Sequence, residues 1–450
     1  MDILQTVVNY VLNDLGAAVF VPLLMLIIGL LMKMKFSEAF HSALTLGVAF
    51  SGMGLLIGYM MTSMGDAAAS MATRTGFSLP AVDGGWPGMA AISWAWPYAF
   101  LMFPLTIGVN IVMLMLKQTK TVNVDMWNVW GKIFTAVMVS YITGNVIMGF
   151  VAATIQIIFE LKAGDMYGPE VERLTGIPGV TVPHFIVLIS VILYPIDKLL
   201  KKIPFFNKPM DADALKEKIG IFGENSVMGA IIGFVLGLAA GYGLSGSLKL
   251  AVQAATAMTL FPMISKLFSQ ALSPVSEAIS EFMRTKFSDR EVFIGLDWPI
   301  LAGRNELWVA VIITIPVLLI MSVILPGNIV LPFAGIINLS FVVGALLLTN
   351  GNLARMIFHG VVSAPLFLYG ATFFATYITR LANETGAAVV EAGKLLSWST
   401  FEGPDFRYLL STGLSGNIVS ILLFVLWAGL FYVLYRARMA YNKKMEEAGE

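Results

Sequence analysis

Acidic side chains stand next to a Trp–Pro pair at two places in an otherwise apolar chain. The first place is Val82–Gly88 (VDGGWPG), and the second is Asp297–Pro299 (DWP). A carboxylate binds hydroxyl groups through charge-assisted hydrogen bonds, and an indole ring offers a flat apolar face to a ligand. Asp83, Trp86 and Asp297 are therefore candidate substrate ligands. The same residue types also suit helix starts, with Asp as the N-cap, Pro in the first turn and Trp at the membrane interface.

Amide and acidic side chains also occur in the first half of the chain. Asp125 and Asn128 lie in the segment Val122–Trp130, where they are either substrate ligands or the cap of an interfacial helix anchored by tryptophans. Asn145 follows Gly144 within an apolar run, so it is either a ligand or a site of close helix packing.

A histidine and a glutamate complete the set of candidates. His184 follows a segment with two prolines and two glycines, and such a broken backbone makes a substrate contact as reasonable as simple packing. Glu306 lies shortly after Asp297, and an intramembrane acid is costly unless it has a function; the alternative is an ion pair with Arg304. His359 is either a proton relay or a packed polar residue.

The composition is that of a membrane protein. Of the 450 residues, 58% are hydrophobic and 12% are charged, and the mean hydropathy is +0.82. The formal net charge is zero, which offers no basis for nucleic-acid binding. The chain has no cysteine, and no phosphate-binding loop or metal-spaced His/Asp/Glu cluster occurs. We therefore expect no metal, no cofactor and no catalytic residues.

The hydropathy pattern predicts an all-α polytopic membrane protein with about 11 transmembrane helices. Basic residues follow alternate predicted spans, so they fall on one side, which the positive-inside rule makes cytoplasmic. The N-terminus is then outside and the C-terminus cytoplasmic. The predicted spans centre near Leu24, Ser51, Phe103, Val146, Ser190, Ile232, Thr259, Ile315, Val343, Phe367 and Leu423.

The predicted spans divide into two halves of opposite orientation, as in inverted-repeat transporters; the alternative is a coincidence of counting. Matching Trp–Pro segments before the third span of each half favour the repeat. We expect one integral membrane domain over 1–450, with a first repeat over 1–200, a cytoplasmic linker over 201–222, a second repeat over 223–390, and the last helix and tail over 391–450.

Several motifs together resemble one transporter family over nearly the whole chain. The chain is similar to the galactitol-type enzyme IIC, the permease subunit of the bacterial sugar phosphotransferase system, which groups with the ascorbate permeases. That resemblance implies a homodimer in the bacterial cytoplasmic (inner) membrane, in which a scaffold carries a mobile core with two re-entrant hairpins that moves as an elevator. The motifs are Val82–Gly88, Val122–Asn128, Ile177–His184, Phe222–Glu224, Ile294–Asp297 and Pro326–Phe333.

The resemblance also implies a function and partners. The substrate would be galactitol or a related polyol, phosphorylated by a phosphocysteine on a separate IIB subunit that a IIA subunit serves, so the chain itself would not be an enzyme. By similarity to the ascorbate relatives, His184 and Asp297 are the best ligands, joined by Asp83 and Trp86. An alternative function is an ion-coupled secondary transporter of a sugar, a polyol or an ascorbate-like anion, with Asp83, Asp297 or Glu306 as the cation site.

Overall fold

The computed structural model describes residues 17–31, 33–123, 125, 127–286, 292–334 and 341–448, and these residues are mostly helical. Residues 1–16, which begin the first predicted repeat and contain the N-terminus, lie outside the described residues.

The long elements are α-helices. In chain order they are α2 (Ala17–Leu31), α3 (Phe36–Thr75), α4 (Gly85–Trp94), α5 (Met102–Met115), α6 (Val129–Thr143), α7 (Val146–Thr175), α8 (Ser190–Leu200), α9 (Ala212–Ile219), α10 (Asn225–Ala239), α11 (Gly243–Lys286), α12 (Asn305–Ile324), α13 (Val342–Thr349), α14 (Leu353–Thr385), α15 (Pro404–Leu414) and α16 (Ile418–Ala448). Short 3-10 turns join some of them, among them η3 (Phe185–Ile189) and η6 (Trp298–Leu301).

Six helices in the described residues are long and apolar enough to cross a membrane, or up to eight if two bent pairs each count as one span. One bent pair joins α4 to the segment Ala99–Met115 at 95°. Two further apolar helices, Val21–Leu31 and α6, are shorter. The chain is therefore a multi-pass membrane protein, and several of its helices are short or broken, as transporter folds commonly show.

Within the part of the chain that the structure describes, six short strands form two parallel sheets, each of three strands. The orders are β5-β1-β6 and β2-β4-β3. Irregular backbone within a membrane protein needs hydrogen-bond partners, and these strands supply them for the segments between the broken helices. The strands are β1 (Ala81–Asp83), β2 (Thr121–Asn123), β3 (Val180–Thr181), β4 (Phe293–Gly295), β5 (Val330–Leu331) and β6 (Leu395–Ser397).

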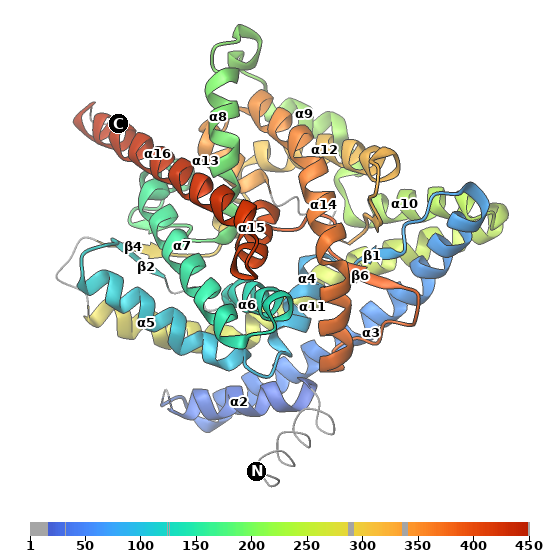
Figure 1. Cartoon of the computed structure of the whole chain (residues 1–450), viewed down its shortest axis with the longest axis horizontal. Helices are drawn as coiled ribbons and strands as arrows, with labels where there is room; N and C mark the ends of the chain where they lie inside the picture. Colours follow the sequence, from blue (N-terminus) through green and yellow to red (C-terminus); the bar gives the residue numbers. More distant parts are fainter. Residues whose placement is uncertain are drawn as a thin grey trace.

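Each sheet exchanges strands between the halves of the chain. The central strand β1 lies between two strands from the second half, and the central strand β4 lies between two strands from the first half. Figure 1 shows β1 and β6 on one side of α4 and α6, and β2 and β4 on the other side. The chain segments around α4 and α6 are thus held by both halves.

The two Trp–Pro segments occupy the same place in the two sheets. Ala81 pairs with the first residue of β5, and Phe293 pairs with the first residue of β2. Trp86 follows Ala81 by the same number of residues as Trp298 follows Phe293. In this register Asp83 corresponds to Gly295, and Asp297 lies two residues further along its own segment.

One expected span is broken. The prediction centred a membrane helix near Val146, but α6 ends at Thr143. The next residue, Gly144, has a left-handed φ of 68°, and α7 begins at Val146. Glycine adopts this conformation without steric cost and commonly ends a helix. The apolar run therefore makes two helices that pack against each other.

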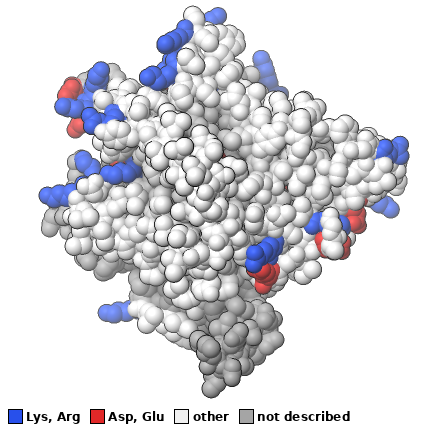
Figure 2. Space-filling model, viewed as in Figure 1, with Lys and Arg blue, Asp and Glu red and all other residues white. Residues whose placement is uncertain are grey.

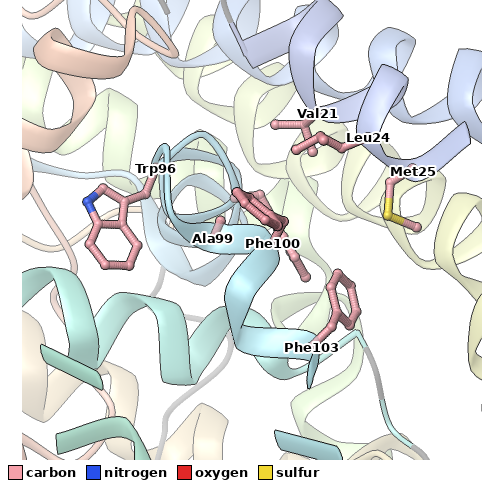
Figure 3. Close-up of a pocket in the computed structure, with 8 residues that line it drawn as sticks. Val21, Leu24, Met25, Trp96, Ala99, Phe100 and Phe103 are labelled. Carbon is pink, nitrogen blue, oxygen red and sulfur yellow. The ribbon is translucent and has the colours of Figure 1, made fainter. Parts of the chain in front are cut away.

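The helices α2, α3, α10 and α11 pack on one another and form one block of the molecule. Between α2 and the bend that joins α4 to α5 lies a small apolar pocket, shown in Figure 3 with Trp96 and Phe103 among its lining residues. Its lining is almost entirely hydrocarbon, so it offers nothing to bind hydroxyl groups. The polar groups of the interior gather elsewhere, between α6, α7 and the ends of the strands.

Candidate functional site

The sheet β2-β4-β3 brings three segments together at the carboxyl ends of its strands. Asn123 ends β2, His184 follows β3, and Asp297 follows β4. Because the strands are parallel, their carboxyl ends meet at one edge, which is where ligands bind in many proteins that contain parallel sheets. The fold therefore places residues from both halves of the chain at one edge.

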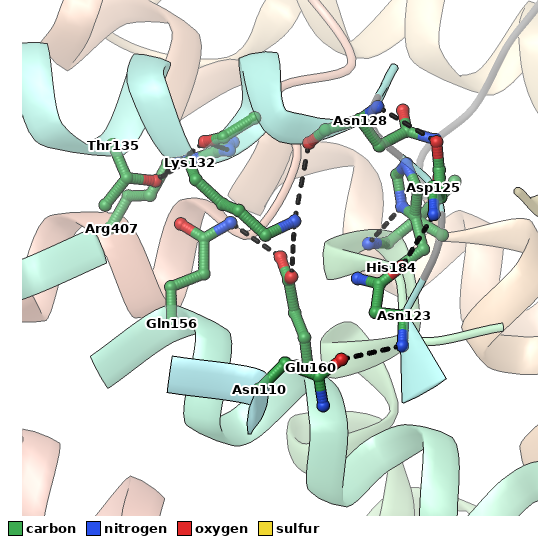
Figure 4. Close-up of polar contacts among 12 residues, drawn as sticks. Asn110, Asn123, Asp125, Asn128, Lys132, Thr135, Gln156, Glu160, His184 and Arg407 are labelled. Atoms are coloured by element: carbon green, nitrogen blue, oxygen red, sulfur yellow. Dashed lines mark hydrogen bonds and ion pairs between the residues drawn. The ribbon is translucent and has the colours of Figure 1, made fainter. Parts of the chain in front are cut away.

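Asp125, Asn128 and Asp297 form a polar cluster at this edge. The Asn128 N–H donates to Asp125 Oδ1 at 3.1 Å, and the Asn128 side-chain amide donates to Asp125 Oδ2. The Asp297 carboxylate accepts from the Trp298 N–H at 2.6 Å and is close enough to Asn128 and Asp125 to interact with both electrostatically. Figure 4 shows Asp125 and Asn128 turned toward each other. The cluster presents two carboxylates and an amide within one small region.

His184 contributes a ring nitrogen near this cluster. Its residue is 5% exposed, and its Nδ1 accepts a hydrogen bond of 3.0 Å from the Ile186 N–H. A neutral ring with Nδ1 as acceptor carries its proton on Nε2. In Figure 4 the ring lies on the same side of the view as Asp125. His184 therefore presents an N–H donor, which complements the acceptor oxygens of the two carboxylates.

Two indole rings lie beside the cluster. Trp86 stands in the first turn of α4 and is half-buried, and its ring meets Trp127 edge to face at a centroid distance of 6.4 Å. Trp127 directly precedes Asn128 and packs on Phe268. Sites for polyhydroxylated ligands commonly combine two kinds of side chain. An aromatic ring packs on the C–H groups of the ligand, and polar side chains bind its hydroxyl groups.

Asp83 has a different environment. Its carboxylate is fully buried and accepts hydrogen bonds from the N–H groups of Gly85 at 2.9 Å, Phe333 at 2.9 Å and Ser399 at 3.1 Å, and from the Ser399 hydroxyl at 2.5 Å. Two carboxylate oxygens have about four acceptor sites in total, so the protein occupies them. Asp83 therefore joins β1 to the segments that follow β5 and β6.

The structure does not bring Asn145 or Glu306 to this cluster. Asn145 caps α7 by accepting from the Ile147 N–H at 2.8 Å, and it stands at the far end of α6 from Asn128, about 22 Å along the helix. Glu306 lies in the first turn of α12 and pairs with Arg304 at 2.5 Å, as the alternative interpretation had it.

A buried ion pair lies behind the cluster, and its residues were not among those that the sequence predicted for the site. Lys132 and Glu160 pair at 2.7 Å, and Gln156 donates to Glu160 at 2.7 Å. Figure 4 shows this group between Asn128 and the body of α7. A lysine within the apolar run of α6 and a glutamate within that of α7 were visible signals in the sequence, because lipid does not tolerate them unpaired.

Arg407 is another buried cation in this region. It is fully buried, donates to Thr135 Oγ1 at 2.9 Å and to the Gly131 carbonyl at 3.0 Å, and lies 4.2 Å from the Phe185 ring centroid. A further bond reaches the Glu402 carbonyl. Arg407 thereby fastens α15 to α6 and to the turn η3 behind His184.

The described residues contain no group of three His, Cys, Asp or Glu side chains close enough to hold a metal ion. Acids and amides in the cluster are suited to neutral hydroxyl groups, which both donate and accept hydrogen bonds. The site can therefore bind a polyhydroxylated molecule with the chain's own side chains.

Known proteins resemble this chain over almost its whole length. The family described as "PTS system sugar-specific permease component" matches residues 10–393. The "PTS system galactitol-specific EIIC component" of Escherichia coli K12 is 33% identical over 438 residues, which cover 96% of each chain, and that of strain O157:H7 matches equally. A "Putative permease IIC component" of strain K12 is 32% identical over 425 residues, which cover 92% of this chain and 96% of that relative. The chain therefore belongs to the sugar-specific permease components of the bacterial phosphotransferase system, which are transporter subunits of the inner membrane.

Proposed function

We propose that the chain is the IIC subunit of a phosphotransferase system and transports galactitol or a closely related polyol. The observation that carries this proposal is the cluster of Asp125, Asn128 and Asp297, which joins both halves of the chain beside His184 and Trp86. The galactitol-specific relatives support the substrate class.

In the proposed complex each side chain has a role set by its chemistry. Asp125 and Asp297 accept hydrogen bonds from substrate hydroxyls, and such charge-assisted bonds are about twice as strong as neutral ones. His184 Nε2 donates to a substrate oxygen, and the Asn128 amide bridges the two carboxylates. Trp86 packs on the C–H face of the carbon chain.

Asp83, Asn145 and Glu306 take structural roles in this proposal. Asp83 holds the first Trp–Pro segment in place, and Asn145 caps α7. Glu306 pairs with Arg304 at the start of α12, where that helix contacts the linker helix α9. Those contacts come from Asn305, which binds Lys216 at 2.7 Å and Asp213 at 2.5 Å. Substitutions at these three positions should affect folding more than substrate affinity.

We also propose that the chain is an inverted repeat. The exchange of strands between the two sheets and the matching register of the Trp–Pro segments support this architecture. Because β6 and α15 follow the other elements of the second half, we assign them to the second repeat. The proposed boundary then moves from residue 390 to about Gly416, and α16 is the added helix. The linker over 201–222 contains α9.

Transport would follow an elevator motion. In this proposal α2, α3, α10 and α11 form a scaffold through which two copies of the chain associate, and the remaining helices carry the site from one side of the membrane to the other. The scaffold exposes large apolar side chains, among them Val235 and Val252, which suit contact with lipid or with a second copy.

The direction of transport would come from phosphorylation by a IIB subunit that a IIA subunit serves. The chain has no cysteine, so the phosphocysteine belongs to another chain. A polyol hydroxyl oxygen forms the new bond to phosphorus, the bond from phosphorus to the partner's sulfur breaks, and the sulfur leaves as a thiolate. The hydroxyl proton passes to a carboxylate of the cluster.

Calorimetric binding to the purified protein tests the substrate class. Galactitol, arabitol, galactose and ascorbate would be titrated into the wild type and into His184→Ala. We expect galactitol to bind best to the wild type and His184→Ala to lose most of that affinity while it keeps its melting temperature. Preferential binding of ascorbate, or normal galactitol binding by His184→Ala, would contradict the proposal.

The excess of acids in the interior favours one alternative, an ion-coupled secondary transporter. This region contains more acidic than basic side chains. The acids are Asp125, Asp297, Glu160 and Glu402, and the bases are Lys132 and Arg407. Uptake of labelled galactitol by cells that lack the general phosphotransferase proteins separates the two functions. We expect uptake to stop in such cells; uptake that persists and collapses with the proton or sodium gradient would establish the alternative.

A further inference from the structure

A basic pocket opens at the beginning of the same sheet whose far end holds the polar cluster. Lys117, Lys120, Lys162 and Lys443 line it, from the end of α5, the turn before β2, and the helices α7 and α16. Lys117, Lys120 and Lys443 are exposed. Figure 2 shows blue side chains gathered at the left edge of the molecule, with red ones beside them at the end of α16; Figure 1 places the ends of α5 and α16 there.

The pocket and the cluster are connected by the strands themselves. Lys120 directly precedes β2, Gly179 directly precedes β3, and Phe293 begins β4, and all three line the pocket. The same three strands lead to Asn123, His184 and Asp297 at their other ends. A strand of three residues spans about 10 Å, so the pocket lies roughly that far from the cluster.

Protein donors hold two of the acids in the pocket. Asp165 accepts from the Thr119 hydroxyl at 2.8 Å, the Lys120 N–H at 2.9 Å and the Thr121 hydroxyl at 2.9 Å. The Glu172 carboxylate accepts from the Gly179 N–H. These two acids are engaged in fixing the starts of β2 and β3. A third acid, Glu446, also lines the pocket, and Lys443 pairs with Glu447 at 3.7 Å. The four lysines still outnumber the three lining acids, so the mouth carries a net positive charge.

The corresponding end of the other sheet is built differently. Lys394, which directly precedes β6, pairs with Asp66 at 2.6 Å and with Glu391 at 2.9 Å. The cation there is neutralised by two carboxylates within the protein. The lysine-rich mouth is therefore a property of one end of the molecule, the end that the charge distribution of the sequence predicts to be cytoplasmic.

From this geometry we infer that the basic pocket is the surface at which the phosphoryl-bearing side chain of the partner protein first docks, before the phosphoryl group moves on to the substrate. A phosphoryl group carries a charge of about −1.5 to −2 at neutral pH and offers three acceptor oxygens, for which clustered lysines are suitable partners. The inference rests on the proposed function, because it requires a phosphorylated partner. It adds the place where that partner approaches and the strands that lead from there to the substrate.

Steady-state phosphorylation of galactitol tests this inference. The full chain is placed in nanodiscs of zwitterionic lipid, and the concentration of phosphorylated IIB protein is varied. The variant is Lys120→Gln/Lys443→Gln, and the matched control is Lys249→Gln, which removes an exposed lysine near the start of α11. We expect the double variant to raise the KM for the phosphorylated IIB protein about tenfold and to leave kcat at saturation nearly unchanged.

Two further arms separate the possible causes. Galactitol affinity, measured by calorimetry, should be equal in the double variant and the control, since the lysines lie outside the substrate cluster. A KM equal to that of Lys249→Gln would overturn the inference, as would an effect that appears only in anionic lipid, because the lysines would then serve lipid headgroups. Failure of the wild type to bind or phosphorylate any polyol would instead overturn the proposed function.

Discussion

Lys132 and Glu160 form an ion pair of 2.7 Å between α6 and α7, and each side chain is 2% exposed. The pair lies one helical turn from Asn128, and the Lys132 ammonium also donates to the Asn128 carbonyl at 3.4 Å. The position of Asn128 against the two carboxylates of the cluster thus depends on a buried charge pair. Both charges have lost their hydration, so each depends on the other for stability.

Removing one partner of this pair should destabilise the protein strongly. We expect Lys132→Met or Glu160→Gln alone to lower the free energy of unfolding by about 3–5 kcal/mol, because an uncompensated buried charge remains. In Lys132→Met/Glu160→Gln both charges are gone and Gln156 keeps a hydrogen-bonding partner, so most of the stability should return. Thermal unfolding in detergent measures all three. A double variant that loses the sum of the single effects would contradict this coupling.

Asp83→Asn should act on folding. The amide replaces an oxygen that accepts from the Phe333 N–H, and leaving that buried donor unpaired costs about 1–3 kcal/mol. We therefore expect a lower melting temperature and an unchanged galactitol affinity per folded molecule. Calorimetry on the folded fraction checks this. An intact melting temperature together with lost binding would make Asp83 a ligand.

Trp86 should contribute affinity through its ring face. Trp86→Ala should weaken galactitol binding about tenfold, and Trp86→Phe should recover part of the loss, since aromatic packing contributes about 0.5–1.5 kcal/mol. Trp308→Phe is the control, because Trp308 donates to the Ala302 carbonyl in the region of Glu306. Equal effects at Trp86 and Trp308 would indicate a general loss of packing.

The absence of cysteine allows a direct test of orientation. Val389 follows the end of α14 and is 76% exposed. Lys443 follows the apolar part of α16, and its side chain is also 76% exposed. We expect a membrane-impermeant maleimide to label Val389→Cys in intact spheroplasts and Lys443→Cys only after the membrane is broken. The reverse pattern would place the lysine-rich mouth outside the cell and refute the proposed docking surface.

The sequence identified most of the cluster because its signals are local. An acid or amide beside Trp, Pro or Gly in an apolar chain marks a broken segment, and Asp125, Asn128, His184 and Asp297 all carry that signal. Asn145 carried it as well, but the left-handed Gly144 turned the expected single span into two helices. Glu306 was ambiguous because its partner Arg304 stands only two residues away.

What the sequence did not reveal depends on contacts between distant segments. The acceptor role of Asp83 involves Phe333 and Ser399 from the other half, and no local pattern announces those partners. Arg407 reaches Gly131 and Thr135 on α6 only after both halves have packed. The strand exchange between the sheets likewise depends on segments of two or three residues, which are too short for hydropathy to detect.

The binding of galactitol to Asp297→Asn tests the central claim most directly. The comparison is with Glu306→Gln, a matched removal of one charge at the Arg304 pair, with melting temperatures measured in parallel. We expect Asp297→Asn to lose about 100-fold in affinity, since a charged hydrogen bond contributes roughly 1.5–3 kcal/mol, and Glu306→Gln to bind as the wild type does. Wild-type affinity in a folded Asp297→Asn protein would show that the polar cluster does not hold the substrate.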